Sequence, residues 1–159
     1  MTGLRTIPMA AAIAGGLTFA TSALAAPIDD LPGRWSGWGT ISLPSGTSEQ
    51  VKCIATYFVT DGGASMVQNL RCASSSYKID ATAKLKNASG ALSGEWEEKT
   101  YSAIGSVSGK TTSDGFNLAI TGDKFTAVLA VTSTNCKQSV TITPIGLEIS
   151  KIAISLGKC

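Results

Sequence analysis

The sequence has 159 residues, with 13 basic and 11 acidic side chains and no histidine. Its net charge is only +2, and the scattered basic residues form no stripe of the kind that binds nucleic acid or an anionic membrane. Without histidine, Ser-His-Asp sites, Cys-His sites and histidine metal sites are excluded. We therefore expect a protein that is not an enzyme, that holds no metal or other cofactor, and that binds no nucleic acid.

Residues 1–25 have the pattern of a secretory signal peptide. Arg5 is their only charge, residues 7–19 form a short apolar run, and residues 23–25 (Ala-Leu-Ala) fit a cleavage site. The run is too short for a membrane span, which takes about 20 apolar residues. The sequence thus predicts export to the periplasm or the extracellular space. The expected mature chain, residues 26–159, is soluble and does not insert into a membrane.

The mature chain begins with a short extended lead, residues 26–32, in which Pro27 and Pro32 resist both helix formation and strand pairing. After the lead, alternating apolar and polar residues form short runs between clusters of turn residues. The runs are residues 33–43, 50–59, 66–73, 77–85, 92–100, 104–111, 116–121, 125–132, 137–143 and 147–156. Alternation of this kind marks strands with one buried face, and frequent turns without a helical pattern indicate antiparallel sheet. We predict one all-β domain over residues 33–159, an antiparallel up-and-down β-barrel of about eight strands, with a β-sandwich as the alternative.

The last run changes phase along its length. Leu147 and Ile149 occupy one phase of the alternation, whereas Ile152 and Ile154 occupy the other. A one-residue slip turns the apolar face of a strand outward unless a bulge absorbs it. We therefore predict a bulge or a sharp bend near residues 150–151.

Four cysteines, Cys53, Cys72, Cys136 and Cys159, allow three disulfide pairings. An even number of cysteines in a short exported chain indicates disulfides, and the lack of C-x-x-C spacing argues against a redox or metal site. Cys53–Cys72 with Cys136–Cys159 is favoured, because each pair would join adjacent or terminal strands. Each bridge would close a loop of about 20 residues and contribute on the order of 3 kcal/mol.

Two short motifs resemble those of a known barrel class. Gly33-Arg34-Trp35 resembles the G-x-W motif that opens the first strand of calycins, the lipocalin- and avidin-type β-barrels. Residues 92–96 (Leu-Ser-Gly-Glu-Trp) are similar to the L-x-G-x-aromatic strands of avidin-like barrels. The resemblance implies a calycin-like barrel in which Trp35 closes one end and a basic residue of the last strand lies across it. Lys151 is the candidate for that residue, and a cation over an indole contributes about 0.5–2 kcal/mol. The alternative is that Trp35 simply packs in a β core.

The first functional hypothesis is a small apolar ligand bound inside the barrel, because closed barrels either hold one small ligand or fill with side chains. The candidate lining residues are aromatic members of the alternating runs, each of which can equally belong to the core. They are Tyr57, Tyr77, Trp96, Phe116 and Phe125.

The second hypothesis is inhibition of a protease or another hydrolase. The exported barrel, the proline-containing lead, the early G-x-W and a disulfide across an early strand pair resemble the small periplasmic metalloprotease inhibitors. The resemblance implies that the lead enters the protease cleft, so that deleting residues 26–31 abolishes inhibition and leaves the fold intact. A third hypothesis is an envelope structural or interaction protein, for which Trp38, opposite in phase to Trp35, would form an exposed contact patch.

The remaining catalytic candidates are three carboxylates, Glu95, Glu97 and Glu98. A glycosidase needs two carboxylates facing each other across a cleft, about 5–9 Å apart. Alternation places Glu95 and Glu97 on the face opposite Trp96, where we expect them to face solvent. This pattern gives no support for an enzyme.

Overall fold

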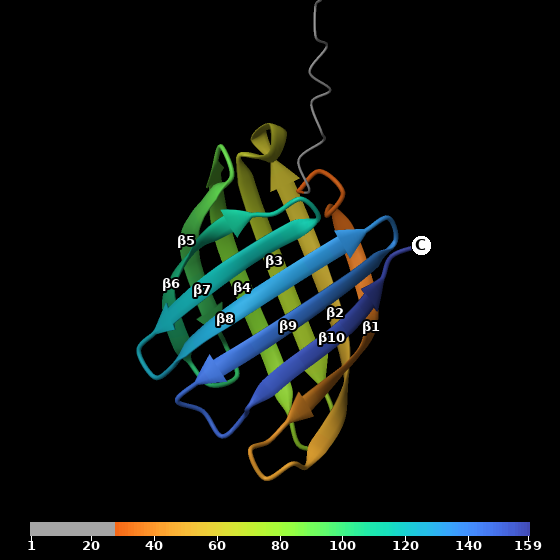
Figure 1. Ribbon diagram of the computed structural model, residues 1–159, viewed down its shortest axis with the longest axis vertical. Coiled ribbons are helices and arrows are strands. Elements are labelled where there is room, and N and C mark those ends of the chain that lie inside the picture. Colours follow the sequence, from red (N-terminus) through yellow and green to blue (C-terminus); the bar gives the residue numbers. More distant parts are fainter. Residues whose placement is uncertain (1–27) are drawn as a thin grey trace, which may run out of the picture.

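The computed structural model describes residues 28–159, which form one closed antiparallel barrel of ten strands. Its elements are β1 (Gly33–Ser42), β2 (Ser48–Thr60), the short 3-10 helix η1 (Asp61–Gly63), β3 (Ser65–Ala73), β4 (Lys78–Ala88), β5 (Ala91–Glu98), β6 (Ala103–Thr111), β7 (Gly115–Gly122), β8 (Thr126–Thr134), β9 (Lys137–Ile145) and β10 (Lys151–Gly157). Each strand pairs with its neighbours in the chain, and β10 pairs with β1 to close the barrel (Figure 1). The expected signal peptide and residues 26–27 of the lead lie outside the described residues.

The predicted all-β barrel is therefore confirmed, and closure excludes the β-sandwich alternative. The predicted number of strands, about eight, is wrong, because the barrel has ten. The sequence itself contains ten alternating runs, one for each strand, and only the resemblance to calycins favoured eight. The difference matters physically, because the diameter of a barrel grows with the number of its strands.

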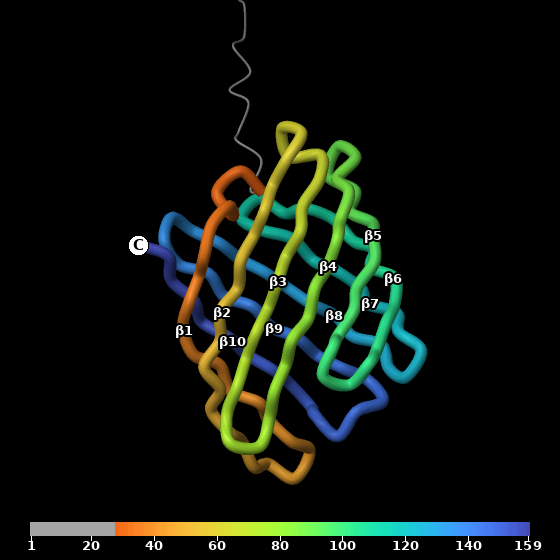
Figure 2. Tube along the Cα trace, turned by 180° about the vertical axis from the view of Figure 1, so that it is seen from behind, coloured from red at the N-terminus to blue at the C-terminus, as the bar shows by residue number. Residues whose placement is uncertain are grey.

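The alternation of each strand follows the pleat, with one set of side chains inside the barrel. In β7, Phe116, Leu118 and Ile120 are buried, whereas Asn117 and Ala119 are exposed. Figures 1 and 2 show that β7–β10 form one wall and β2–β5 the opposite wall, with the two sets of strands crossing obliquely. The inner faces of both walls meet in one hydrophobic core cluster.

The phase change in the last run has a simple cause. The chain bends at residues 146–148, and β10 begins only at Lys151. Leu147 and Ile149 therefore belong to the loop between β9 and β10, and only the residues that follow belong to the strand. The bulge or bend predicted near residues 150–151 is therefore misplaced: the bend lies at residues 146–148, before the strand begins, and no bulge inside the strand is needed.

One end of the barrel is closed by the segment that precedes β1. Residues 28–30 form a turn, and the backbone N–H of Leu31 donates to the carbonyl oxygen of Ile28 at 3.2 Å. Ile28, Leu31 and Trp35 have no exposed surface. The indole Nε1 of Trp35 donates to the carbonyl oxygen of Leu31 at 2.8 Å. Trp35 therefore lies fully buried at the closed end, hydrogen-bonded to the segment that precedes β1.

The cation over Trp35 is not the predicted one. The Nζ of Lys158 lies 4.8 Å from the centroid of the Trp35 ring. Lys151 pairs with Ser42 at the other end of β1, whereas Gly157 pairs with Ser36 beside Trp35. The prediction of Lys151 is wrong because β10 runs antiparallel to β1, so that only the end of β10 can reach the start of β1.

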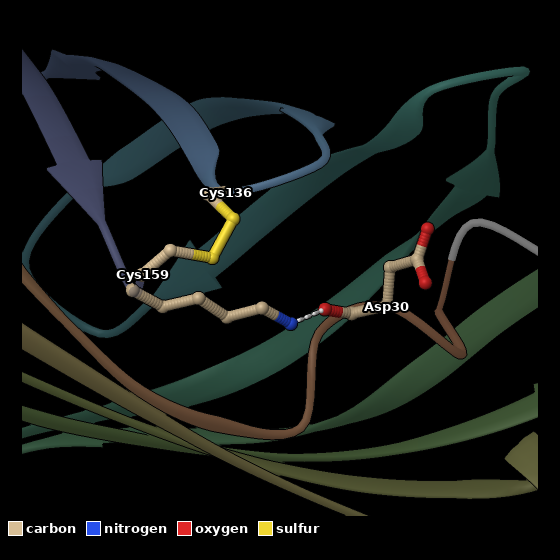
Figure 3. The surroundings of a disulfide bond; sticks show 4 residues. Asp30, Cys136 and Cys159 are labelled. Carbon is tan, nitrogen blue, oxygen red and sulfur yellow. Dashed lines mark hydrogen bonds between the residues drawn. A yellow bond between two sulfur atoms is a disulfide. The ribbon is translucent and has the colours of Figure 1, made fainter.

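Both favoured disulfides, Cys53–Cys72 and Cys136–Cys159, are present. Cys53 and Cys72 are directly opposite each other on β2 and β3, and both are buried inside the barrel. Cys136–Cys159 fastens the end of the chain to the turn before β9, and Lys158 beside it donates to the carbonyl oxygen of Asp30 (Figure 3). The C-terminus, the N-terminal turn and Trp35 are thus held together at the closed end.

A pair of disulfides indicates an oxidising compartment, in agreement with export. Within residues 28–159, no helix has both the length and the apolar character that a membrane crossing requires.

Candidate functional site

The other end of the barrel contains a cavity of about 570 Å³. Inward-facing residues of β3–β10 line it, and the loops after β1, β3, β5, β7 and β9 surround its mouth. Most of the lining side chains are apolar. They include Leu70, Ile79, Ala81, Ala83, Trp96, Ala103, Val107, Leu118, Ile120, Phe125, Ala127, Leu129, Ile142 and Ile152.

Small side chains account for the cavity. Ala81 and Ala83 on β4, Ala103 on β6 and Ala127 on β8 occupy inward positions on three different strands around it. A barrel of about eight strands is just wide enough for side chains to fill, and a wider one needs larger side chains to fill it. Here ten strands are combined with alanines, so the space in this half of the barrel stays open.

Two aromatic residues form one side of the cavity. Trp96 and Phe125 pack edge to face, with ring centroids 5.3 Å apart and an interplanar angle of 87°. Trp96 on β5 is directly opposite Gly105 on β6, which in turn pairs with Gly122 on β7. A Cβ atom at Gly105 would collide with the backbone of β7, so this strand contact requires glycine. The two glycines thus allow β6 and β7 to approach each other closely beside Trp96.

The five predicted lining residues separate into two groups. Tyr77, Trp96 and Phe125 line the cavity. Tyr57 and Phe116 do not line it; both are buried in the core. For these two, the prediction is wrong because alternation identifies the inner face of a strand but not the level along the barrel axis.

One polar side chain, that of Gln68, lines the cavity at the end nearest the closed end. The Nε2 of Gln68 donates to the hydroxyl of Tyr57 at 3.0 Å, and that hydroxyl donates to the Oε1 of Gln138 at 3.0 Å. Burial raises the pKa of Tyr57 far above its usual value, so the phenol stays protonated and neutral. Gln68 lines the cavity, and this chain of hydrogen bonds fixes its side chain.

Gln68 was not predicted from the sequence, although its position carries a signal. On β3, Met66, Gln68 and Leu70 share one phase, and all three are buried. A polar residue in the apolar phase of a strand is the pattern that marks a buried hydrogen-bonding group.

The mouth of the cavity carries the charged lining residues Glu98, Lys124 and Glu148. The Glu98 carboxylate accepts hydrogen bonds from the backbone N–H groups of Asp80 and Tyr101, both at 2.7 Å. The Nζ of Lys124 donates to the carbonyl oxygen of Tyr101 at 3.2 Å. Glu98 and Lys124 therefore hold the loop between β5 and β6 in place at the rim.

The other two carboxylates of this segment point away from the cavity. Glu95 and Glu97 are exposed on the outer face of β5, as expected from the alternation. Glu98 and Glu97 therefore lie on opposite faces of one strand, and these carboxylates do not face each other across the cavity. Within the described part of the chain, residues 28–159, no group of three or more Cys, Asp or Glu residues is arranged to hold a metal ion.

The features that suggested an inhibitor or an interaction protein differ in exposure. In the lead, Asp29 and Asp30 are exposed, but Ile28 and Leu31 are buried in the core. The expectation that deletion of residues 26–31 leaves the fold intact conflicts with that burial. Trp38 is 59% exposed, as predicted from its phase.

Comparison with known proteins adds no family assignment: no protein-family model matches the sequence, and the curated proteins give no significant match.

Proposed function

We propose that this protein is a non-catalytic binding protein that holds a small apolar ligand in the open half of its barrel. The observation that carries the proposal is the cavity itself, about 570 Å³ in volume and lined mainly by apolar side chains. Pockets for small molecules commonly measure roughly 300–1,000 Å³ and combine an apolar lining with a few polar groups. The cavity has both properties.

The contrast with ordinary packing supports the proposal. Protein interiors are packed as densely as organic crystals, and voids larger than a water molecule are few. The closed half of the barrel follows this rule, with fully buried Trp35, Tyr57 and Phe116. The open half departs from it where Ala81, Ala103 and Ala127 stand at inward positions.

The proposed place of action is outside the cytosol, in the periplasm or the extracellular space. The two disulfides and the predicted signal peptide support this assignment. The hydrolase-inhibitor and envelope-protein hypotheses stay predictions. Because Ile28 and Leu31 are buried in the barrel, the segment from residue 28 onward is not free to enter a protease cleft, which argues against the inhibitor hypothesis.

The test is titration of the oxidised chain, residues 26–159, with the neutral fluorescent probe N-phenyl-naphthylamine. We expect saturable binding of one probe per barrel, with the increase in fluorescence that accompanies an apolar site. The variant Ala127→Phe places an aromatic ring in the cavity and should weaken binding by more than about ten-fold, the loss expected when more than 1.4 kcal/mol of binding energy is removed.

A matched control comes from the same strand. Ala130 on β8 has the opposite phase to Ala127 and does not line the cavity, so Ala130→Phe should bind the probe as the unmodified protein does. If the unmodified protein shows no saturable binding, or if both variants lose it equally, the proposal is wrong.

A further inference from the structure

The deep end of the cavity carries a hydrogen-bonding group with spare capacity. Among the residues of β3, Gln68 and Leu70 line the cavity, whereas Met66, one step closer to the closed end, does not. Gln68 is therefore the β3 residue at the floor, and its side chain is 5% exposed.

The hydrogen bonds determine which atom of Gln68 is left over. The Tyr57 hydroxyl has one proton, which it donates to the Oε1 of Gln138, so its oxygen accepts from the Nε2 of Gln68. The Oε1 of Gln68 then accepts no hydrogen bond from any other group in residues 28–159. This oxygen is not one of the fully buried polar atoms without a partner, which within residues 28–159 are the Oγ of Ser133 and the Nε2 of Gln138. It therefore keeps accessible surface, and it belongs to a residue that borders the cavity.

The charges at the floor and at the mouth of the cavity both favour a neutral ligand. The polar group at the floor is the uncharged amide of Gln68, so a charged head there would be buried without a counter-ion. At the mouth, Glu98 and Glu148 outnumber Lys124, so an anionic head would meet more negative than positive charge.

We propose that the ligand is a neutral, largely apolar molecule with one hydroxyl group, and that it enters hydroxyl first. Its O–H donates to the Oε1 of Gln68, and its apolar body lies against Trp96 and Phe125 toward the mouth. This inference rests on the proposed function and specifies the ligand class for the same cavity.

Competition against N-phenyl-naphthylamine with three ligands of equal chain length tests the inference. n-Decanol can donate a hydrogen bond, decyl methyl ether cannot, and decanoate carries a charge. For the unmodified protein we expect decanol to bind about five-fold more tightly than the ether, the ratio given by one hydrogen bond of ordinary strength, and decanoate to bind most weakly. Gln68→Leu should remove the preference for the alcohol, whereas Asn69→Leu, an adjacent position on β3 outside the cavity lining, should keep it.

The outcomes separate the two proposals. If none of the three ligands displaces the probe and the probe itself does not bind, the proposed function fails. If the alcohol and the ether bind equally well to the unmodified protein, the role of Gln68 is overturned while the apolar cavity site stands. Tighter binding of decanoate overturns the neutral head group. The comparison of alcohol with ether needs no variant, so it tests the proposed hydrogen bond from the ligand hydroxyl even if Gln68→Leu does not fold.

Discussion

The same ten strands form both halves of the barrel, but side chains fill the interior of one half and leave the other half open. At the closed end, Trp35, Tyr57 and Phe116 fill the space, and the turn of residues 28–30 lies over them. In the open half, Ala81 and Ala127 leave a cavity of about 570 Å³. The number of strands sets the width of the barrel, and the size of the inward side chains decides whether that width becomes core or cavity.

The largest expected difference between the halves is in how much free energy of unfolding is lost when a tryptophan is replaced by alanine. Trp35→Ala should lower the free energy of unfolding by about 3–5 kcal/mol, because it empties a fully buried site. It also removes the hydrogen bond to Leu31 and the contact with Lys158. Trp96→Ala should cost only about 1–2 kcal/mol, because Trp96 is half-buried and borders space that is already open. Equilibrium unfolding in urea measures both, and equal costs would contradict the distinction between the halves.

A second pair of variants enlarges a side chain instead. Ala55 is fully buried and lies opposite Trp35, so Ala55→Leu should overpack the core and cost about 1–3 kcal/mol. Ala127→Leu extends into the cavity and should change the free energy of unfolding by less than about 1 kcal/mol. The same urea titration compares them, and a larger loss for Ala127→Leu would mean that the cavity is not open space.

The smallest expected effect is a pH dependence at the rim of the open half. Hydrogen bonds from Ser74 and then from Ser76 lower the pKa of Glu49 from 4.5 to about 2. The backbone N–H of Ser76 lies 3.1 Å from its Oε1, which connects β2 to the loop after β3. A folded-state pKa below the unfolded value stabilises the fold above pH 4.5, and this contribution is lost as the pH falls toward about 2.

Glu49→Gln should therefore melt at a slightly lower temperature than the unmodified protein at pH 7, and the difference should shrink between pH 4.5 and pH 2. Glu95→Gln, at an exposed position on β5, is the control and should show no such change. A difference in melting temperature for Glu49→Gln that is constant with pH would rule out the hydrogen-bonded carboxylate as its cause.

Much of the fold could be predicted from local sequence pattern. Alternation located each strand and its inner face, and the spacing of the cysteines favoured the two disulfides that form. The basic residue over Trp35 could also have been predicted correctly. Antiparallel pairing of the last strand with the first brings the end of β10, and not Lys151, to the start of β1. The resemblance to a smaller barrel supplied the wrong number of strands.

The cavity could be predicted only in part. Tyr57 and Phe116 have the same alternating context as Tyr77 and Phe125, yet the first two belong to the core and the last two to the cavity. Which level of the barrel a residue occupies depends on strand register and tilt, and these are set by contacts far apart in the sequence. An open space is likewise a property of many side chains together, so no single position could reveal it.

Methyl-detected NMR during titration with n-decanol tests the division of the barrel into a filled and a hollow half most directly. We expect saturable shift changes at cavity methyl groups such as those of Leu118, Ile142 and Ile152, and none at Ile28 or Leu31 of the closed end. Shift changes spread over both halves, or confined to exposed residues on the outer face, would contradict the account.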